Sequence, residues 1–480
     1  MDALTTSETV PAMPPTIGAL VLAAGKGTRM YSDDPKVLRT LLGEPMLAYV
    51  LDSLLPLFGE RAHVVVGFGA NKVRAAFPEM DGRFVEQREQ LGTGHALQCA
   101  WGAIKEAGYE YLLVLNGDVP LIGTDDIKTC IDAVTQTKCG KEGHVAGRAK
   151  ADLAFLTTTL SDPGAYGRVV RKTSGQTVIV EAKDYDEKAH GPVTGEINAG
   201  IYCLRVSAVD KVLFDLTNVN KSGEFYITDL TRLVAEAGGT VVAVNRGNDE
   251  NLLGINTPAE LVRTEETLRA RIVEKWLSRG VVIRQKESVR IGPKARLAPG
   301  CELCGPCDIL GQSIIWPGAV IAPHVWIKDS EIGERTKVHA FSHLEGVRIG
   351  QGVEVGPFAR LRPGAVLAEG SRVGNFVELK KTVIGPNAKA GHLTYLGDAE
   401  IGADVNVGAG TITCNYDGKN KFKTVIGKNA FIGSNTALVA PVNVGENALV
   451  AAGSVITEDV PDNALAIARG RLTIKKRKDR

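Results

Sequence analysis

An aliphatic residue recurs at every sixth position through much of the C-terminal half of the chain. Two uninterrupted runs show this spacing: Ile349, Val355, Leu361, Leu367, Val373 and Leu379, and then Ile426, Ile432, Leu438, Val444, Val450 and Ile456. A helix repeats about every 3.6 residues and a half-buried strand every two, so neither alone explains a period of six. A hexapeptide period predicts a parallel β-helix, in which each short side contributes one aliphatic side chain to a shared interior.

The hexapeptide spacing is interrupted between Val407 and Ile426. We expect Thr411 to Phe422 to form a loop that leaves the coil, and loops on rigid scaffolds are common places for a site. The repeat region also holds Cys301, Cys304 and Cys307 in a CxxCxxC pattern. Such a pattern can bind a metal, but no fourth cysteine lies nearby, so we interpret these three as side chains of the solenoid.

The N-terminal half, from Thr16 to about Arg246, alternates short apolar runs with helical patterns. This alternation predicts a Rossmann-like α/β domain with a buried parallel sheet. The predicted parallel strands are Ile17–Ala24, His63–Phe68 and Tyr111–Leu115, the clearest helix is Met46–Phe58, and added antiparallel strands are expected at Leu153–Thr158, Arg168–Arg171 and Thr177–Glu181.

A capping box, Thr257-Pro258-Ala259-Glu260, begins a long helical pattern that ends at Gly280. We interpret this helix as the linker between two domains. The chain is thus divided into a disordered extension (1–15), an α/β domain (16–250), a linker helix (251–280), a hexapeptide-repeat domain (281–470) and a basic tail (471–480). The tail is expected to be solvated, with contact to an anion as the alternative.

Charge and hydropathy exclude several classes of partner. The chain has 56 Lys and Arg against 55 Asp and Glu, a net charge of +1, so no overall field favours nucleic acid. No segment approaches the ~20 apolar residues that a membrane helix needs, and the N-terminus lacks the pattern of a signal peptide. Together with the scattered cysteines, this predicts a reduced, cytoplasmic protein without nucleic-acid partners or membrane insertion.

A glycine-rich turn follows the first apolar run, in the segment Leu22-Ala23-Ala24-Gly25-Lys26-Gly27-Thr28-Arg29-Met30, with Pro35-Lys36 shortly after. Glycines let backbone amides approach phosphate oxygens closely. Met30 replaces the third glycine of a dinucleotide fingerprint, and Gly27 is not followed by the Lys-Ser/Thr of a Walker loop. The turn therefore predicts a phosphate site of another kind.

This turn resembles that of the nucleotide-sugar pyrophosphorylase family, and further motifs follow in the family's order. They are Gln87, Leu91-Gly92-Thr93-Gly94, Asn116-Gly117-Asp118-Val119-Pro120-Leu121, Tyr166-Gly167-Arg168, Val180-Glu181 and Glu196-Ile197-Asn198-Ala199-Gly200. From about Ile17 to Arg469 the chain is most similar to the bifunctional N-acetylglucosamine-1-phosphate uridyltransferase / glucosamine-1-phosphate N-acetyltransferase family. One departure is Asn116, where an aromatic residue is frequent.

Nucleotidyl transfer brings two anions together, so it depends on positioning and charge neutralisation. Asp118 comes directly after an apolar strand, where a carboxylate can hold Mg²⁺, and Arg29 and Lys36 can meet phosphate charge. The resemblance implies that Asn256 is the second metal contact. It also implies a UDP-N-acetylglucosamine site in which Gln87, Gly92 and Thr93 hold the uracil, Gly167, Glu181 and Asn198 hold the amino sugar, and Leu22, Ala23, Ala24, Gly25, Lys36, Asn116 and Gly117 complete the pocket.

Several polar residues of the C-terminal half are not needed by the repeat. Acetyl transfer requires a free amine, and His392 is the candidate base because histidine titrates near neutrality. By resemblance, Arg362 and Lys380 bind the sugar phosphate, and Tyr395 and Asn406 hold the sugar. The same resemblance assigns acetyl-CoA to Ala409, Asn415, Tyr416, Ser434, Ala452 and Arg469.

The resemblance further implies a left-handed β-helix, a homotrimer that shares its acetyl site between subunits, and two reactions. Acetyl-CoA and glucosamine 1-phosphate give N-acetylglucosamine 1-phosphate, which UTP converts to UDP-N-acetylglucosamine and pyrophosphate for cell-wall peptidoglycan and lipopolysaccharide synthesis. The alternatives are a single-activity pyrophosphorylase with a structural or regulatory β-helix, and a non-catalytic binding module. The residues around His392 argue against the first, and Arg29, Lys36 and Asp118 argue against the second.

Overall fold

The computed structural model describes residues 12–14, 16–135 and 150–475. The described part of the chain divides into two compact units, one that ends at residue 265 and one that begins at residue 266. The division falls within α8 (Pro258–Ser278), the helix predicted as a linker. Most of the extension and part of the basic tail lie outside the described residues, but Met13 donates a backbone hydrogen bond of 2.8 Å to Leu57.

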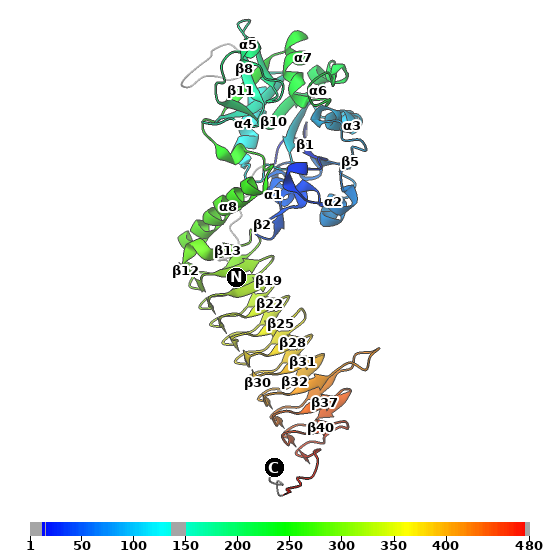
Figure 1. Ribbon diagram of the computed structural model, residues 1–480, viewed down its shortest axis with the longest axis vertical. Helices are drawn as coiled ribbons and strands as arrows, with labels where there is room; N and C mark the ends of the chain where they lie inside the picture. The colour runs from blue at the N-terminus through cyan, green and yellow to red at the C-terminus, as the bar shows by residue number, and fades with distance from the viewer. Residues whose placement is uncertain (1–11, 15, 136–149, 476–480) are drawn as a thin grey trace, which may run out of the picture. The chain divides into compact units, whose positions relative to one another are not determined.

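The described residues of the N-terminal unit form a nine-stranded mixed sheet (Figure 1). Its main order is β11 (Val241–Asn245), β7 (Leu153–Thr159), β10 (Glu196–Arg205), β6 (Tyr111–Asn116), β1 (Ile17–Ala23), β4 (Ala62–Val66) and β5 (Phe84–Glu86). Strands β6, β1, β4 and β5 are parallel, whereas β10 runs antiparallel to β6 and β7. The antiparallel pair β8 (Arg168–Arg171) and β9 (Thr177–Val180) joins β10.

Both faces of this sheet are buried, as the continuous apolar runs predicted. Ala19 and Val21 of β1 belong to one hydrophobic cluster, and Leu20 and Leu22 belong to another. This division follows from the two-residue period of a strand. The helices of the unit are α1 (Met46–Phe58), α2 (Ala70–Ala76), α3 (Thr93–Glu106), α4 (Thr124–Thr135), α5 (Glu187–His190), α6 (Val206–Val209) and α7 (Leu230–Glu236).

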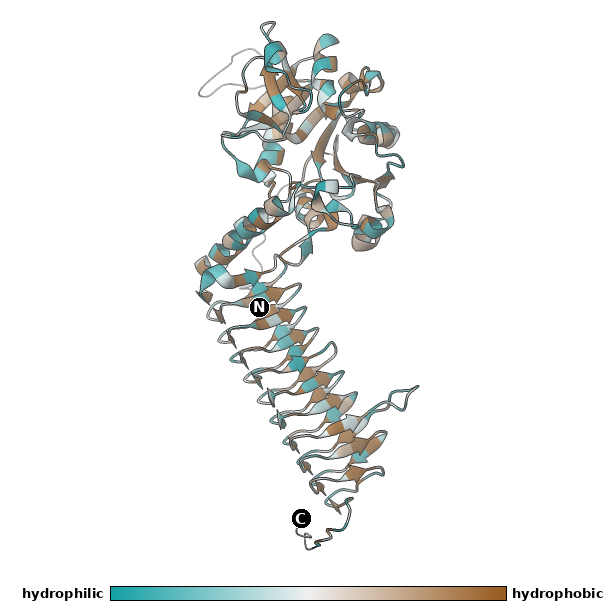
Figure 2. Ribbon diagram, in the orientation of Figure 1, coloured by the Kyte–Doolittle hydropathy of each residue, from teal (hydrophilic) through white to brown (hydrophobic). Residues whose placement is uncertain are grey.

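The capping box at the start of α8 forms as predicted. The backbone N–H of Glu260 donates to Thr257 Oγ1 at 3.2 Å, and the backbone N–H of Thr257 donates to Glu260 Oε2 at 3.1 Å. The helix is mostly hydrophilic along its length (Figure 2), and Val273 and Trp276 are its buried apolar residues. Gly280 ends the pattern with a φ of 84°.

The C-terminal unit is a parallel β-helix with three sheets, one for each side of the coil. The first sheet has β12 (Val282–Arg284), β15 (Glu302–Cys304), β18 (Val320–Ile321), β21 (Lys337–Val338), β24 (Glu354–Val355), β27 (Arg372–Asn375), β30 (Lys389–His392), β33 (Asn406–Val407), β36 (Phe431–Ile432), β39 (Leu449–Val450) and β41 (Leu465–Ala466). The second has β13 (Val289–Ile291), β16 (Cys307–Leu310), β19 (Val325–Lys328), β22 (His343–Glu345), β25 (Arg360–Leu361), β28 (Glu378–Lys380), β31 (Tyr395–Gly397), β34 (Ile412–Cys414), β37 (Ala437–Val439) and β40 (Val455–Ile456). The third has β14 (Arg296–Leu297), β17 (Ile314–Ile315), β20 (Glu331–Ile332), β23 (Arg348–Ile349), β26 (Val366–Leu367), β29 (Val383–Ile384), β32 (Ala399–Ile401), β35 (Thr424–Ile426) and β38 (Val442–Val444).

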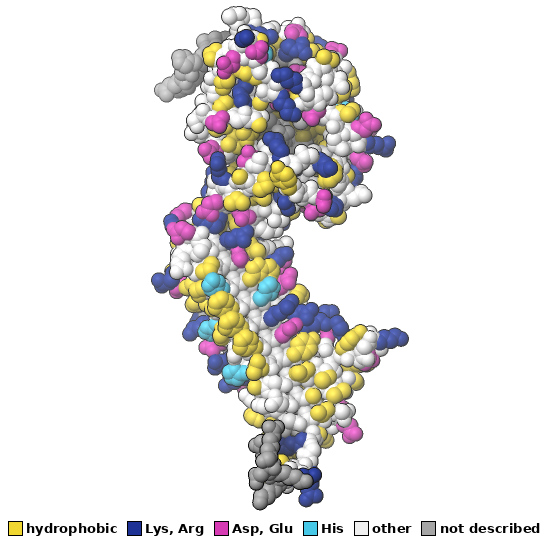
Figure 3. Space-filling view, viewed as in Figure 1, with side chains coloured by type: hydrophobic (Ala, Val, Ile, Leu, Met, Phe, Trp, Pro, Cys, Tyr) yellow, Lys and Arg dark blue, Asp and Glu magenta, His cyan; other side chains and the backbone are white. Residues whose placement is uncertain are grey.

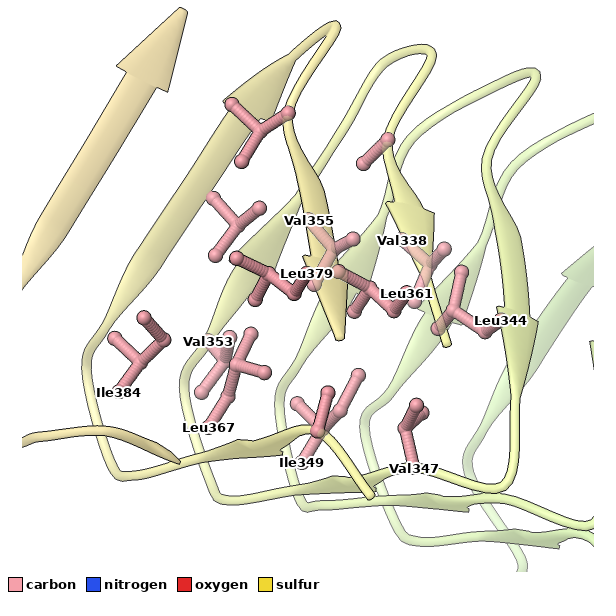
Figure 4. Close-up of a cluster of buried hydrophobic side chains, with 14 of the residues drawn as sticks. Val338, Leu344, Val347, Ile349, Val353, Val355, Leu361, Leu367, Leu379 and Ile384 are labelled. Carbon is pink, nitrogen blue, oxygen red and sulfur yellow. The ribbon is translucent and has the colours of Figure 1, made fainter. Parts of the chain in front are cut away.

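The hexapeptide aliphatic residues line the interior of the β-helix. Figure 4 shows these side chains pointing inward from successive coils. Leu361 pairs in register with Leu344 of the preceding coil and Leu379 of the next, and all three are fully buried. Cys301 and Cys307 are buried in the same core, in agreement with their interpretation as solenoid side chains.

The predicted loop at Thr411 to Phe422 begins later than the sequence pattern indicated. Residues Ile412–Cys414 are strand β34 and pair with β37. Thr411 and Thr413 are buried, and Thr413 Oγ1 accepts from the backbone N–H of Gly397 at 2.8 Å. The interior of the β-helix accepts these threonines, so the segment that leaves the coil starts at Asn415.

Removing a leucine from this interior should destabilise the β-helix. We expect Leu361→Ala to lower its free energy of unfolding by about 2–5 kcal/mol, because the substitution leaves a cavity between two stacked leucines. Urea unfolding followed by circular dichroism measures the loss. Val366→Ala, at a position that is 37% exposed, is the matched control and should cost less than about 1 kcal/mol; equal losses would contradict the inward packing.

Candidate active sites

A pocket of about 470 Å³ lies where β1 and β6 end in the N-terminal unit. These strands are parallel neighbours, so Ala23 and Asn116 meet at the same edge of the sheet. In the sheet β1 lies between β4, the next of these strands along the chain, and β6, which follows later. The order of strands therefore reverses at β1, and ligands of α/β sheets commonly bind in the crevice at such a switch point. The pocket is lined by many of the residues that the sequence singled out: Leu22, Ala23, Ala24, Gly25, Arg29, Lys36, Gln87, Gly92, Thr93, Asn116, Asp118 and Asn256.

The glycine-rich turn forms one wall of this pocket. Gly27 has a φ of 65°, and a side chain there would meet Lys36 Cβ at 2.6 Å. The turn is therefore restricted to glycine at this position by both conformation and space. Lys26 extends over the ring of Phe68, with its Nζ 5.4 Å from the ring centre.

A compact cluster of charged and amide groups lies in the lining of the pocket. Lys36 Nζ forms a salt bridge with Asp118 Oδ2 and donates to Asn256 Oδ1 at 2.8 Å. The guanidinium of Arg29 donates to the same Asn256 oxygen at 3.0 Å. The other carboxylate oxygen, Asp118 Oδ1, is buried and has no hydrogen-bond partner among the described residues.

Four predicted residues of the nucleotide-sugar site do not line the pocket itself: Gly117, Gly167, Glu181 and Asn198. Gly117 lies behind it, where a side chain would contact Ala23 and Val37 at 3.3 Å. The other three form a second group. The backbone N–H of Asn198 donates to Gly167 at 2.9 Å, and a side chain on Gly167 would meet Glu181 Oε1 at 3.5 Å.

The pocket lining also includes Lys26, Gly27 and Thr28 of the glycine-rich turn, to which the sequence assigned no individual role, and four residues that it did not single out: Val37, Gln90, Ala96 and Glu224. The three residues of the turn could have been predicted as pocket residues from their place in that motif. Glu224 comes from a distant loop that is held by Asn220, whose Nδ2 donates to the Glu224 carbonyl at 2.6 Å. No local motif marks it.

The Glu181 carboxyl is buried, and burial raises its pKa above the ordinary 4.5 even though Thr228 donates a hydrogen bond to it at 3.0 Å. A carboxyl with a raised pKa confers stability fully below its ordinary pKa and loses it as the pH rises through the folded value. We therefore expect Glu181→Gln to melt at a higher temperature than wild type at pH 8 and at the same temperature at pH 4, in calorimetric scans.

Glu196→Gln is the control with the opposite sign. Burial of Glu196 is outweighed by hydrogen bonds from Arg171 and Thr157, which hold the pKa of its carboxyl below the ordinary value. This variant should melt below wild type at pH 8. A Glu181→Gln protein that also melted lower at pH 8 would contradict the unfavourable burial of the Glu181 carboxylate.

In the β-helix, His392 is exposed at the end of β30 and pairs in register with Asn375. His392 Nδ1 lies 2.5 Å from Asn375 Oδ1. A carboxamide oxygen only accepts hydrogen bonds, so in the neutral ring this contact favours the tautomer with the proton on Nδ1 and the lone pair on Nε2. This arrangement suits Nε2 to act as a base.

A second group of predicted residues gathers beside the projecting loop. Lys380 Nζ lies 3.7 Å from Asp398 Oδ2, which also accepts from Asn415 Nδ2 at 2.5 Å. The hydroxyl of Tyr395 lies over Gly397, the strand partner of Lys380. Lys421, which the sequence did not single out, lies near Lys380, and this proximity raises the pKa of Lys380 and lowers that of Lys421. Two facing amines favour an anion between them.

The remaining predicted residues lie along the coils near these two groups. Arg362 donates to Glu378 at 2.9 Å, and Glu378 is the strand partner of Tyr395. Asn406 lies on β33, next to the strand of His392. Ala409 and Ser434 occupy matching turns of successive coils. Arg469 donates to the Ala452 carbonyl at 3.0 Å. Tyr416 is exposed on the projecting loop.

Comparison with known proteins matches both units to families. Residues 19–160 match the MobA-like NTP transferase domain family, and residues 423–458 match the hexapeptide repeat of succinyl-transferase family. The chain is 57% identical over 97% of its length to a protein named Bifunctional protein GlmU from Nitratidesulfovibrio vulgaris (strain DP4), of which it covers 99%. The chain belongs to the GlmU family. A GlmU of Lawsonia intracellularis is 46% identical over 94% of this chain and 96% of that protein, and one of Heliobacterium modesticaldum is 44% identical over 95% and 96%.

Membership of the GlmU family confirms the resemblance found in the sequence. The chain is a bifunctional transferase, with uridyltransferase activity in the N-terminal unit and acetyltransferase activity in a left-handed β-helix of hexapeptide repeats. Membership of the GlmU family also supports the predicted role in cell-wall synthesis. None of the helices in the described part of the chain combines the length and apolarity needed to cross a membrane.

Proposed function

We propose that UTP and N-acetylglucosamine 1-phosphate react in the pocket at the ends of β1 and β6 to give UDP-N-acetylglucosamine and pyrophosphate. The observation that carries the proposal is that Arg29, Lys36 and Asp118 line one pocket beside the glycine-rich turn. The two cations neutralise phosphate charge, while the turn offers backbone amides to the phosphates. Gln87, Gly92 and Thr93 hold the uracil. Glu181 and Asn198, in the group beside the pocket, hold the sugar, and Asn116 lines the pocket.

Mg²⁺ fits this pocket. Asp118 offers a carboxylate with one buried oxygen lacking a hydrogen-bond partner, and Asn256 offers an amide oxygen. No group of three or more His, Cys, Asp or Glu side chains that could hold a metal occurs among the residues described. A small ligand set is typical of Mg²⁺ sites that complete their octahedron with phosphates and water. Bound there, Mg²⁺ would neutralise phosphate charge.

The acetyl reaction is proposed to take place at His392. Nε2 of His392 removes the proton from the amine of glucosamine 1-phosphate as the amine attacks the thioester carbonyl of acetyl-CoA; the C–S bond then breaks, and coenzyme A leaves as a thiolate that takes up a proton. Lys380 and Lys421 hold the sugar phosphate together with Arg362, and Tyr395 and Asn406 hold the sugar. Asn415, Tyr416 and the edge formed by Ala409, Ser434, Ala452 and Arg469 take acetyl-CoA. The location is proposed to be cytoplasmic, since the described cysteines are free, as is typical of proteins in a reducing compartment.

A coupled assay tests both assignments together. Wild-type protein supplied with glucosamine 1-phosphate, acetyl-CoA, UTP and Mg²⁺ should release thiol first and pyrophosphate afterwards. Omission of acetyl-CoA should abolish both products, and N-acetylglucosamine 1-phosphate should restore pyrophosphate alone. Release of pyrophosphate from glucosamine 1-phosphate at the same rate without acetyl-CoA would contradict the proposed order of reactions.

The protein is proposed to be a homotrimer that shares its acetyl site. An exposed aromatic column runs along one edge of the β-helix, where apolar and histidine side chains gather in Figure 3. His324, Phe341, Phe358 and Phe376 stack with ring centres 4.7, 4.9 and 5.3 Å apart. The three phenylalanines are about half exposed, and this column ends at Leu393, directly after His392. Burial against another copy would remove this apolar surface from water.

A charge in the aromatic column should therefore dissociate the trimer. We expect Phe358→Asp to be monomeric in sedimentation experiments and to lose at least about 10-fold of its acetyl transfer, while uridylyl transfer is retained. Val219→Asp, at a site 90% exposed in the N-terminal unit, should stay trimeric. A trimeric Phe358→Asp protein would place the subunit interface elsewhere.

A further inference from the structure

The ammonium group of Lys36 contacts both side chains that are proposed to hold the metal. It pairs with Asp118 Oδ2 and donates to Asn256 Oδ1 at 2.8 Å. Asn256 cannot easily turn away, because its amide nitrogen donates to the Gly254 carbonyl at 3.1 Å. Its oxygen therefore faces Lys36 and Arg29, which both donate to it. In this arrangement a protein cation occupies the space between the two proposed metal ligands.

A divalent ion and this ammonium compete for Asn256 Oδ1 and for the charge of the Asp118 carboxylate, although Asp118 Oδ1 has no hydrogen-bond partner among the described residues. Mg²⁺ requires ligand oxygens at about 2.1 Å, so an ion bound to Asn256 Oδ1 and Asp118 Oδ1 would lie against an ammonium that stays hydrogen-bonded to Asn256 Oδ1. Two cations this close repel each other strongly in a partly buried pocket, where the side chains of Lys36 and Asp118 are only 12% and 17% exposed. Lys36 must therefore give up at least one of its two contacts when both ligands bind the metal.

The Lys36 ammonium has a second position available to it, near the glycine-rich turn. Its aliphatic stem packs against the glycine-rich turn, since a side chain on Gly27 would meet Lys36 Cβ, Cγ and Cδ within 3.1 Å. The stem can stay in this position while the last torsions carry the ammonium from Asp118 towards the turn. Phosphate oxygens bound by the turn would offer the ammonium a new partner.

We propose that Lys36 is an internal counter-ion that exchanges with the divalent cation and so couples metal binding to nucleotide binding. Without nucleotide, Lys36 keeps Asp118 and Asn256 in place and weakens metal binding. With nucleotide, its ammonium pairs with the phosphates, which frees Asn256 Oδ1 and moves the positive charge away from the Asp118 carboxylate. By linkage, each ligand tightens the other by the same factor. This inference rests on the proposed metal site at Asp118 and Asn256.

The test measures Mn²⁺ binding to the full-length protein by electron paramagnetic resonance, with and without saturating UDP-N-acetylglucosamine. In wild type we expect the nucleotide sugar to tighten Mn²⁺ binding about 10-fold or more. Lys36→Met cannot supply a competing ammonium or an oxygen ligand. It should bind Mn²⁺ about 10-fold more tightly than wild type without the nucleotide sugar. The factor by which the nucleotide sugar tightens Mn²⁺ binding should be at least 5-fold smaller than in wild type.

Lys26→Met is the matched control, because Lys26 lines the same pocket but extends over Phe68 rather than towards Asp118. Its Mn²⁺ affinity without nucleotide sugar should stay within about 3-fold of wild type, since general loss of positive charge is a weaker effect. An equal gain in Lys26→Met and Lys36→Met would overturn the exchange. Unchanged or weaker Mn²⁺ binding by a folded Lys36→Met protein would overturn it as well.

Asp118→Asn separates this inference from the proposed metal site. If this variant loses Mn²⁺ binding but Lys36→Met shows no gain, the metal site stands and the exchange is wrong. If Asp118→Asn binds Mn²⁺ as wild type does, the metal lies elsewhere and both proposals fail. Reciprocal titration of wild type with UDP-N-acetylglucosamine, with and without Mn²⁺, needs no variant, and absence of coupling there would also refute the exchange.

Discussion

His392→Ala should lower the rate of acetyl transfer by about 10²–10⁴-fold, because the general base is removed while the β-helix keeps its shape. His392 is exposed and its ring contributes little to the core, so the variant should fold normally. Thiol release from acetyl-CoA with glucosamine 1-phosphate measures the loss. Pyrophosphate release from UTP and N-acetylglucosamine 1-phosphate should be unchanged, since the nucleotide pocket belongs to the other unit.

Asn375→Ala gives an internal control for the role of His392. This variant loses the group that fixes the ring tautomer but keeps the base itself. We expect a smaller loss of kcat, on the order of 10-fold, as is typical when an orienting partner of a histidine is removed. Loss of both activities in a folded His392→Ala protein, or equal losses in the two variants, would argue against His392 as the base.

Asp118→Asn should have the complementary effect on the two activities. The substitution keeps the shape of the side chain but removes the only negative charge among the two proposed metal ligands. A metal ion supplies several kcal/mol of charge stabilisation, so uridylyl transfer should fall by about 10³-fold. The measurement is pyrophosphate release at saturating UTP and N-acetylglucosamine 1-phosphate.

Acetyl transfer by Asp118→Asn should remain at the wild-type rate, which also shows that the protein is folded. Asp249→Asn is a useful comparison, because Asp249 is a helix cap whose carboxylate accepts from the backbone of Asn251 at 3.0 Å. Its uridylyl transfer should change less than about 3-fold. Retention of uridylyl transfer in Asp118→Asn would exclude Asp118 from the charge-neutralising role.

Much of the fold was predictable because its determinants are local. The helix at Met46–Phe58 has the predicted bounds, and the long linker helix begins with the predicted capping box. The hexapeptide period placed Leu361 and its neighbours in the interior. The start of the projecting loop was predicted too early, because buried threonines such as Thr413 can continue a coil where the aliphatic period stops.

The nucleotide pocket shows where motifs suffice and where they do not. Gly25, Arg29 and Lys36 lie close together in the sequence, so the glycine-rich turn could be identified as one unit. Glu224 reaches the same pocket from a loop without any recognisable motif. Glu181 and Asn198 carry motifs, yet they form a separate group beside the pocket, and only the arrangement of β8, β9 and β10 decides this.

By itself, the sequence determined the two architectures, the glycine-rich turn and the identity of the candidate base, because side-chain periodicity and short motifs depend on neighbouring residues. Only the tertiary structure decided that Lys36 would meet Asp118, 82 residues away, and Asn256, 220 residues away. It also placed Asn375 against His392 across one coil. Such contacts depend on how strands and coils stack, and their free energy comes from groups that the chain brings together only when it folds.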